Sequence, residues 1–452
     1  MVHTFEALGV KLAVDVNSGA VHVLDDLTYR LLPLVEPPMA EHCPPELLAR
    51  LPEYRTEAVE EGWQDLRELA GNGLLFVEDD YVVPAAATAL QQSAPIKALC
   101  LHVSHDCNLR CQYCFASTGD FGTGRKIMDI ETAKRAIDFV IQRSGSRRNI
   151  EVDFFGGEPL MAMDTVKATV AYARSIEKKA GKCFRFTITT NGVLLDDENI
   201  DYINREMSNA VLSLDGRPQV NDRMRKTVNG KGSYEVIVPK FQKLVAGRGT
   251  KDYYLRGTFT HYNLDFAEDV MHMADLGFRN VSVEPVVGEE TCGYALKDED
   301  LPVVLEQYEK LAEKLKDRTD VNFFHFNVDL AQGPCVIKRL RGCGAGCEYV
   351  AVTPEGDIYP CHQFVGNPAY KIGSLSDGSF DMELSHRFSC LNIYTREECR
   401  DCWARFYCSG GCSASNLLVN GDIKKPNHVG CEMERKRLEC AIALKALAAG
   451  MG

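Results

Sequence analysis

The chain contains no run of about 18 consecutive apolar residues, the length that a membrane-spanning helix needs. The opening segment, MVHTFEALGV, also lacks the basic start and the apolar stretch of a signal peptide. We therefore expect no transmembrane helix and predict a cytoplasmic protein.

An excess of basic charge is absent as well. The 452 residues include 51 Lys and Arg against 64 Asp and Glu, which gives a net charge of -13. Most of the excess lies in residues 1–84, where five basic and sixteen acidic side chains differ by -11. Nucleic acid is a poor partner for such a surface, because phosphate binding needs clustered Lys and Arg. A basic peptide would suit it better, and a plain solvated acidic face is the alternative that the charge leaves open.

Cysteine, in contrast, is abundant, with eighteen residues in the chain. A reducing cytoplasm disfavours disulfides, so this many thiols indicate metal binding. Seven cysteines stand apart from any spacing pattern, and we expect them to be ordinary thiols: Cys43, Cys100, Cys183, Cys292, Cys335, Cys390 and Cys440.

Residues 1–84 predict a small module of their own. Alternating apolar residues in Val10–Val16 and in Val21–Val23, on either side of a turn, indicate a β-hairpin within residues 5–32. Helical periodicity follows at residues 45–51 and 57–71, and residues 73–81 are typical of a short wing. These features favour a winged-helix module, with a decorative cap on the next domain as the alternative. The Ala-, Gln- and Ser-rich residues 85–96 predict a linker.

Residues 97–317 alternate between strands and amphipathic helices, so we predict an α/β domain with a parallel sheet, in the form of a partial (β/α)6 barrel. In such barrels the chemistry gathers at the carboxyl ends of the strands. The expected strands are Ala98–Ser104, Ile150–Phe155, Phe184–Thr190, Ala210–Asp215, Tyr254–Thr260 and Val281–Val286, and helices are expected at Ile130–Arg143, Met163–Lys178 and Asp300–Lys316.

Three cysteines directly follow the first of these strands. Cys107, Cys111 and Cys114 lie in the run CNLRCQYC. Three thiolates can hold three irons of a [4Fe–4S] cluster and leave the fourth iron open to another ligand. The spacing alone would also allow a zinc knuckle that lacks one ligand.

The second strand ends in the run FFGGEP, which contains Gly156, Gly157, Glu158 and Pro159. The two glycines allow a ligand to approach the backbone closely, and the carboxylate can receive an ammonium group. With this run placed one β/α unit after the cysteine triad, the chain resembles the radical S-adenosylmethionine (SAM) superfamily.

That resemblance implies that the triad binds a [4Fe–4S] cluster whose open iron takes the amino and carboxylate groups of SAM. It also implies that Glu158 contacts the amino group, and that reduction cleaves SAM to a 5′-deoxyadenosyl radical. Later strand ends supply further candidate contacts, although Asp215 also fits a plain turn and Arg256 an ion pair. The candidates are Thr190, Asn191, Ser213, Asp215 and Arg256.

The loop-rich C-terminal part, residues 318–452, holds the second cysteine pattern and ends in a helix predicted at residues 432–447. Its spacing alone would allow structural zinc. These C-terminal cysteines resemble those of the SPASM domain of radical SAM peptide maturases. The resemblance implies two auxiliary [4Fe–4S] clusters, and therefore three clusters in the whole chain. By that resemblance one auxiliary cluster takes Cys399, Cys402, Cys408 and Cys431, and the other takes Cys343, Cys361 and Cys412, with or without Cys347.

Whether Cys347 is a ligand decides what the latter cluster can do. With it the cluster is closed and serves as an electron relay or a structural element; without it one iron is free to take a substrate cysteine. The sequence leaves both open.

The sequence around Cys361 helps to choose among the maturases. Sulfatase maturases usually carry Asp directly after this cysteine, whereas here His362 follows it. Nearly the whole chain, including the opening Asp15–Val23 and the stretch Gly342–Phe364, resembles maturases of six-cysteine (SCIFF) peptides.

This closer resemblance implies thioether bonds between a cysteine sulfur and a carbon of a precursor peptide whose leader docks on residues 1–84. It also implies a low-potential ferredoxin or flavodoxin as electron donor. Carbon–carbon crosslinking and formylglycine formation are the enzymatic alternatives, and a non-catalytic Fe–S peptide-binding module is the alternative from another class.

Overall fold

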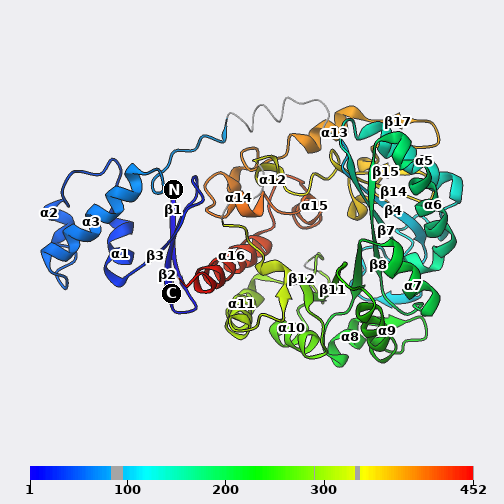
Figure 1. Ribbon diagram of the computed structural model, residues 1–452, viewed down its shortest axis with the longest axis horizontal. Coiled ribbons are helices and arrows are strands. Elements are labelled where there is room, and N and C mark those ends of the chain that lie inside the picture. Colours follow the sequence, from blue (N-terminus) through cyan, green and yellow to red (C-terminus); the bar gives the residue numbers. More distant parts are fainter. Residues whose placement is uncertain (83–94, 290, 331–335, 451–452) are drawn as a thin grey trace.

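The computed structural model describes residues 1–82, 95–289, 291–330 and 336–450 (Figure 1). Most of the predicted linker, residues 85–94, and Cys335 therefore lie outside the described residues. No helix in the described ranges is long and apolar enough to cross a membrane.

The centre of the molecule is a parallel sheet in which all six predicted strands are present. Its strands lie side by side in the order β4, β7, β8, β9, β11, β12, and the short β13 pairs with β12 at the far edge. The order does not close on itself, so the fold is an open, partial barrel. The bounds are β4 Ala98–His105, β7 Asn149–Gly156, β8 Cys183–Thr190, β9 Asn209–Ser213, β11 Asp252–Phe259, β12 Asn280–Pro285 and β13 Asn322–Phe323.

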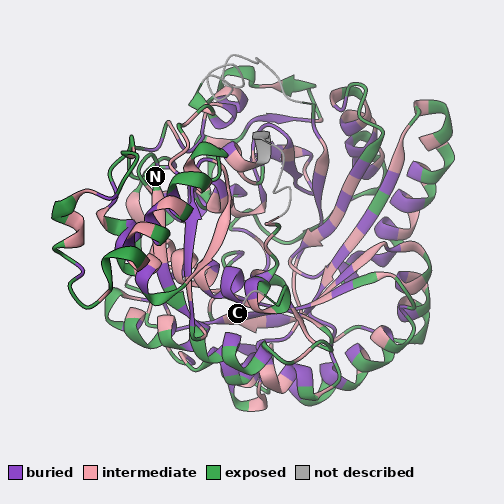
Figure 2. Ribbon diagram, turned by 60° about the vertical axis from the view of Figure 1, so that its left-hand side comes forward, coloured by how far each residue is buried: buried purple, intermediate pink, exposed green. Residues whose placement is uncertain are grey.

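Helices line the outer side of this sheet (Figure 1), and their starts and buried faces follow from the sequence. The Asp129 side chain caps α5 by accepting a hydrogen bond from the Thr132 amide, and α5 buries Ala133, Ile137 and Val140 against the sheet. Figure 2 shows buried faces turned inward and exposed faces turned outward. The helices are α5 Ile130–Arg143, α6 Met163–Ala180, α7 Asp197–Glu206, α8 Pro218–Met224, α9 Tyr234–Ala246, α10 Phe266–Asp275 and α11 Leu301–Leu315, with 3-10 turns at Pro159–Ala162, Asp298–Asp300 and Phe324–Phe326.

Three short strands lie beside the core: β5 Leu109–Cys111, β6 Lys126–Ile127 and β10 Arg225–Thr227. β5 pairs with β10, and Cys111 lies opposite Arg225. This pairing brings the cysteine loop next to a segment that is about 110 residues away in sequence.

The N-terminal module is a three-stranded antiparallel sheet followed by helices. The predicted hairpin is confirmed as β2 paired with β3, and β1 adds a strand that the sequence pattern did not reveal. The bounds are β1 Val2–Ala7, β2 Val10–Asp15, β3 Val21–Leu24, α1 Asp26–Leu31, a 3-10 turn Leu32–Leu34, α2 Pro45–Leu48 and α3 Thr56–Gly71. The hairpin prediction extended too far, because residues 26–31 are helical.

The predicted wing at residues 73–81 is wrong, since these residues form turns and bends instead of strands. They are held by the C-terminal part of the chain: Asp79 accepts hydrogen bonds from the Tyr394 hydroxyl at 2.6 Å and from Arg405 Nη2 at 3.0 Å. Arg405 Nη2 also donates to Asn17 Oδ1 at 2.7 Å. This polar cluster fixes the segment against the rest of the molecule.

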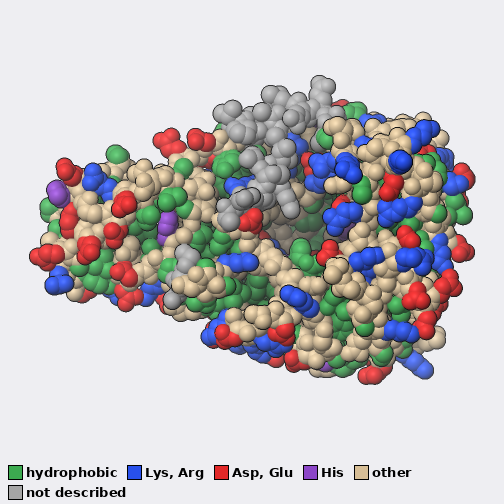
Figure 3. Space-filling model, viewed as in Figure 1, with side chains coloured by type: hydrophobic (Ala, Val, Ile, Leu, Met, Phe, Trp, Pro, Cys, Tyr) green, Lys and Arg blue, Asp and Glu red, His purple; other side chains and the backbone are tan. Residues whose placement is uncertain are grey.

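The N-terminal sheet is covered on both faces, which explains why β2 is buried along almost all of its length. One face packs on α1 and α3 around Trp63. The other packs on the C-terminal part, where His3 stacks on Trp403 with ring centroids 4.0 Å apart. Red carboxylate side chains are scattered over this lobe in Figure 3.

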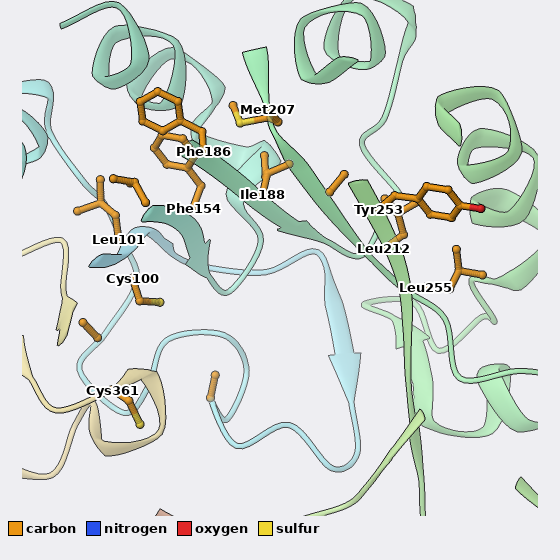
Figure 4. Close-up of a cluster of buried hydrophobic side chains, with 14 of the residues drawn as sticks. Cys100, Leu101, Phe154, Phe186, Ile188, Met207, Leu212, Tyr253, Leu255 and Cys361 are labelled. Carbon is orange, nitrogen blue, oxygen red and sulfur yellow. The ribbon is translucent and has the colours of Figure 1, made fainter. Parts of the chain in front are cut away.

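The C-terminal part is more closely joined to the barrel than its loop-rich sequence suggests. β14 pairs in parallel with β4, and β15, β16 and β17 continue the same sheet as an antiparallel meander. Figure 4 shows Cys361 of this part lying near Cys100 of β4 within one cluster of buried side chains.

Apart from the long closing helix α16, the elements of the C-terminal part are short. They are α12 Val336–Arg341, β14 Tyr349–Val352, β15 Asp357–Tyr359, β16 Gly373–Ser374, β17 Ser379–Phe380, α13 Met382–Ser389, α14 Arg405–Cys408, α15 Ser413–Asn420 and α16 His428–Ala448, with 3-10 turns at His362–Phe364, Pro368–Tyr370 and Glu397–Cys399.

Candidate functional site

A cavity of about 190 Å³ opens at the carboxyl ends of the parallel strands, where the cysteine triad was expected. Cys107, Cys111 and Cys114 all line it. Burial raises the pKa of the Cys107 and Cys111 thiols to about 12. Thiols of this kind remain protonated at neutral pH unless a metal binds them, because metal binding removes the proton. The remaining lining comes from strand ends and from the C-terminal part, including Gly156, Gly157, Glu158, Thr190, Asn191, Ser213, Arg225, Arg256, Glu284, His362 and Gln363.

Gly156 and Gly157, at the end of the second strand, lie so close to neighbouring backbone that no side chain would fit there. A Cβ atom on Gly156 would lie 2.1 Å from the Ser104 carbonyl oxygen, and one on Gly157 would lie 2.2 Å from that of Asp106. Gly156 also has a positive φ of 126°. The close approach is therefore made by the strand that leads into the triad, and it fixes the triad loop against the end of β7.

Glu158 is buried and its carboxylate accepts three hydrogen bonds from the protein. It accepts hydrogen bonds from Thr190 Oγ1 at 2.7 Å, from the Asn191 amide at 2.8 Å and from the Leu160 amide at 3.0 Å. Desolvation nevertheless raises its pKa to about 7. The carboxylate thus ties the end of β7 to the end of β8, and it lies in the cavity wall where the sequence predicts a contact to the SAM amino group.

Asn191 connects Glu158 to the triad. Its side-chain Nδ2 donates to Asn108 Oδ1 at 2.8 Å and lies 3.6 Å from Cys107 Sγ. Among the predicted SAM contacts, Ser213 and Arg256 also line the cavity.

Two predicted contacts do not line the cavity. Pro159 is buried at the start of a 3-10 turn. Asp215 is completely buried, and it accepts hydrogen bonds from the Tyr113 hydroxyl at 2.7 Å and the Thr258 amide at 2.9 Å while pairing with Arg225 Nε at 3.0 Å. Its role in the structure is to hold Tyr113 of the triad loop and Arg225 in place.

Sequence reasoning missed two charged residues of the cavity wall, Arg225 and Glu284. Glu284 Oε1 pairs with Arg256 Nε at 3.2 Å, so the ion-pair alternative for Arg256 holds within the cavity wall. Glu284 ends the sixth strand and could have been found by the same strand-end criterion as the others. Arg225 had no comparable signal, because only the pairing of β5 with β10 brings it to the triad.

The C-terminal cysteines fall into two groups. The pKa of Cys408 is raised to about 12 and that of Cys431 to about 11, mainly by burial, with further contributions from Cys399 and, for Cys431, Cys402. In the other group, the pKa of Cys361 is raised to about 12. Burial is the main cause, and Cys412 and Cys343 contribute to the rise. Cys408 and Cys412, four residues apart, thus have different thiol neighbours.

Cys347 differs from both groups. Its Sγ donates to the Gly344 carbonyl oxygen at 3.4 Å, and the residue lines a separate cavity together with Pro95, Arg143 and Met382. Cys343 is close enough to raise its pKa, after burial and Glu348. The Cys347 thiol therefore lies near the group of Cys361, but it donates its hydrogen bond to the backbone.

In the described part of the chain, no three His, Cys, Asp or Glu side chains converge on a single metal position. A tetrahedral zinc site needs sulfurs about 2.3 Å from one centre, whereas a four-iron cluster places each thiolate on its own iron. Both kinds of site use cysteine thiolates, so the residue types present suit either.

Comparison with known proteins decides between iron–sulfur clusters and zinc. Residues 101–255 match the family model of the radical SAM superfamily. The chain carries a radical SAM domain. Residues 343–403 match a second family model, SPASM, described as an iron–sulfur cluster-binding domain. The radical SAM and SPASM domains mark an enzyme that binds [4Fe–4S] clusters and SAM.

Similar proteins include maturases. The chain is 24% identical over 345 residues to the cysteine-type anaerobic sulfatase-maturating enzyme of Clostridium perfringens, covering 70% of this chain and 89% of that one. It is 26% identical over 350 residues to the mycofactocin maturase MftC of Mycolicibacterium smegmatis, covering 74% and 82%.

Solved structures confirm the α/β fold with its parallel-rich sheet. Native anSMEcpe with bound AdoMet and the Cp18Cys peptide superposes with a TM-score of 0.65, covering 79% of this chain and 100% of that one at 20% identity. Streptococcus suis SuiB bound to the precursor peptide SuiA superposes with a TM-score of 0.55, covering 95% and 98% at 16% identity.

Proposed function

We propose that this radical SAM enzyme forms thioether crosslinks in a cysteine-rich precursor peptide. The supporting observation is the arrangement around Cys361. Cys343, Cys361 and Cys412 form a group of three, while the Cys347 thiol donates to a backbone carbonyl and lines another cavity. A cluster with three protein thiolates leaves one iron for a substrate cysteine.

The triad cavity extends to the residues that follow Cys361 in the chain. His362 and Gln363, which follow Cys361 in the chain, line the same cavity as Cys107, Cys111 and Cys114. A peptide bound there has its cysteine beside one cluster and its acceptor carbon beside the SAM site. Proximity of this kind supplies much of the rate of a coupling reaction.

The triad, Glu158 and Asn191 would hold the cluster and SAM, and SAM supplies a 5′-deoxyadenosyl radical that removes hydrogen from the acceptor carbon. In the coupling the peptide loses one carbon-bound hydrogen and one thiol proton as the carbon–sulfur bond forms. A cluster held by Cys343, Cys361 and Cys412 would accept the one electron that remains, and a low-potential ferredoxin or flavodoxin would supply the electron that cleaves SAM.

The N-terminal module is the proposed docking site for the leader of the peptide. In the sheet order β1-β2-β3, β3 has only one neighbour among the described strands, so its other edge is available for an added strand. The acidic character of residues 1–84 suits a basic leader. The relationship to SuiB, which is known bound to a precursor peptide, supports this mode.

The test is anaerobic incubation of the reconstituted enzyme with SAM, reductant and cysteine-rich precursors, followed by mass spectrometry. We expect a peptide lighter by two hydrogens, with one thiol lost per crosslink. The Cys111→Ala variant should bind peptide but not cleave SAM. A product that keeps all its thiols would instead favour carbon–carbon crosslinking, and peptide binding without SAM cleavage by the unaltered enzyme would favour a non-catalytic binding module.

A further inference from the structure

Arg396 is a buried arginine whose guanidinium lacks the partners that such a group needs. The residue is 2% exposed, and its Nη2 donates to Ser413 Oγ at 2.9 Å. Nε and Nη1 are buried and have no hydrogen-bond partner among the residues that the structure describes. An unpaired buried charge costs several kcal/mol, so a fold keeps one only when another group compensates it.

The backbone around Arg396 is built to leave room for the guanidinium. Gly410 has a φ of 89°, and a Cβ atom at this position would lie 2.3 Å from Arg396 Nη1. Gly410 stands between Cys408 and Cys412, the two cysteines that belong to different thiol groups. The guanidinium therefore lies against the short segment that links the two groups.

Cysteines of both groups lie near the guanidinium and, once metal binding removes their protons, would compensate its charge. Burial lowers the pKa of Arg396, and Cys399, Cys408, Cys343 and Cys412 raise it. Cys399 and Cys408 belong to the group that also contains Cys402 and Cys431, and Cys343 and Cys412 belong to the group of Cys361. A planar guanidinium has donors along several of its edges, so it can serve two neighbouring acceptors at once.

We infer that Arg396 lies between the two auxiliary clusters as a shared hydrogen-bond donor and counter-charge, and that it positions both clusters and raises their reduction potentials. Hydrogen bonds to cluster sulfurs and nearby positive charge stabilise the reduced, more negative form. Arg396 is thus a positioning residue for electron flow between the clusters. The inference rests on the cysteine assignment of the proposed function but not on thioether chemistry.

The test uses the anaerobically reconstituted full chain and compares Arg396→Gln with Arg396→Lys. Iron content and the midpoint potential of each cluster are measured by a redox titration followed by electron paramagnetic resonance. The matched control is Arg248→Gln, which removes a buried arginine whose donors all go to protein oxygens, including the carbonyls of Ile203, Ser208 and Asp252.

We expect Arg396→Gln to move both auxiliary potentials to more negative values, Arg396→Lys to move them less, and neither to move the SAM-binding cluster. Loss of only the auxiliary irons from Arg396→Gln would also support the inference. If Arg396→Gln does not fold, the auxiliary cluster potentials of Arg396→Lys decide whether the inference holds. Iron content and potentials equal to those of the wild type and Arg248→Gln would overturn the inference, and a missing thioether product alone would count only against the proposed function.

Discussion

At the scale of single residues, the cavity depends on side chains that are already held by hydrogen bonds within the protein. Glu158 accepts from Thr190 and from two backbone amides, and Asp215 holds both Tyr113 and Arg225. Such groups cost little to reorganise when a ligand arrives, because the protein has fixed them in advance. The cavity wall is therefore organised before SAM binds.

Glu158→Gln should weaken this organisation while preserving size. An amide nitrogen would face at least one backbone N–H group, and an unsatisfied buried donor costs about 1–3 kcal/mol. We expect the free energy of unfolding to fall by about this amount and SAM binding to weaken, as measured by urea denaturation and calorimetry. Glu151→Gln is the control, because Glu151 lies on the strand β7 that precedes Glu158 but is half exposed and 3.6 Å from Arg185. Equal effects of both substitutions would contradict the role of Glu158.

Cys347 provides the second prediction at this scale. Its thiol donates to Gly344, so Cys347→Ala should retain the full iron content of about twelve per chain, whereas Cys361→Ala should lose about four. Iron and sulfide analysis after reconstitution measures this difference. If Cys347→Ala lost as much iron as Cys361→Ala, the cluster would be closed and a substrate thiol would have no open iron.

At the scale of secondary structure, the sequence predicted the six parallel strands and their helices because apolar residues either run together, as in β4, or alternate, as in β8, between amphipathic segments. β1 and β14 were missed for a different reason. β14 is only four residues long, and its pairing with β4 joins segments about 250 residues apart. The triad could be found from local spacing, but Arg225 reaches it only through such long-range pairing.

The predicted wing failed for the same physical reason. Residues 73–81 take their conformation from contacts with the C-terminal part, where Asp79 binds Tyr394 and the buried Arg405. Arg405 belongs to α14, which ends at Cys408. The segment therefore links the N-terminal module to an element that carries a predicted cluster ligand.

Asp79→Asn tests this link. Removing the carboxylate weakens the pairing of a buried charge, which costs 3–5 kcal/mol for a fully buried pair, and about 2 kcal/mol is expected here because Asp79 is 23% exposed. Limited proteolysis should release the N-terminal module faster, and the urea midpoint should fall. The exposed neighbour Asp80 supplies the control as Asp80→Asn, and equal proteolysis of the two variants would argue against the link.

At the scale of the whole molecule, the N-terminal module, the barrel and the C-terminal part share packed surfaces. The N-terminal sheet packs on Trp403, α16 packs on α11, and β14 extends the barrel sheet. The cysteine groups of the C-terminal part are thereby held in fixed positions relative to the triad cavity. This rigidity is what electron transfer and coupling between neighbouring clusters require.

Iron analysis of the whole molecule tests whether Cys408 and Cys412 bind different auxiliary clusters. Cys408 and Cys412 are four residues apart, yet Cys408 has Cys431 and Cys399 as neighbours while Cys412 has Cys343. If they belong to separate clusters, Cys408→Ala and Cys412→Ala should each remove about four irons, and the double variant about eight. The loss is additive because the clusters have no ligand in common. A double variant that loses only about four irons would place both cysteines on one cluster, and Cys390→Ala, outside both groups, should lose none.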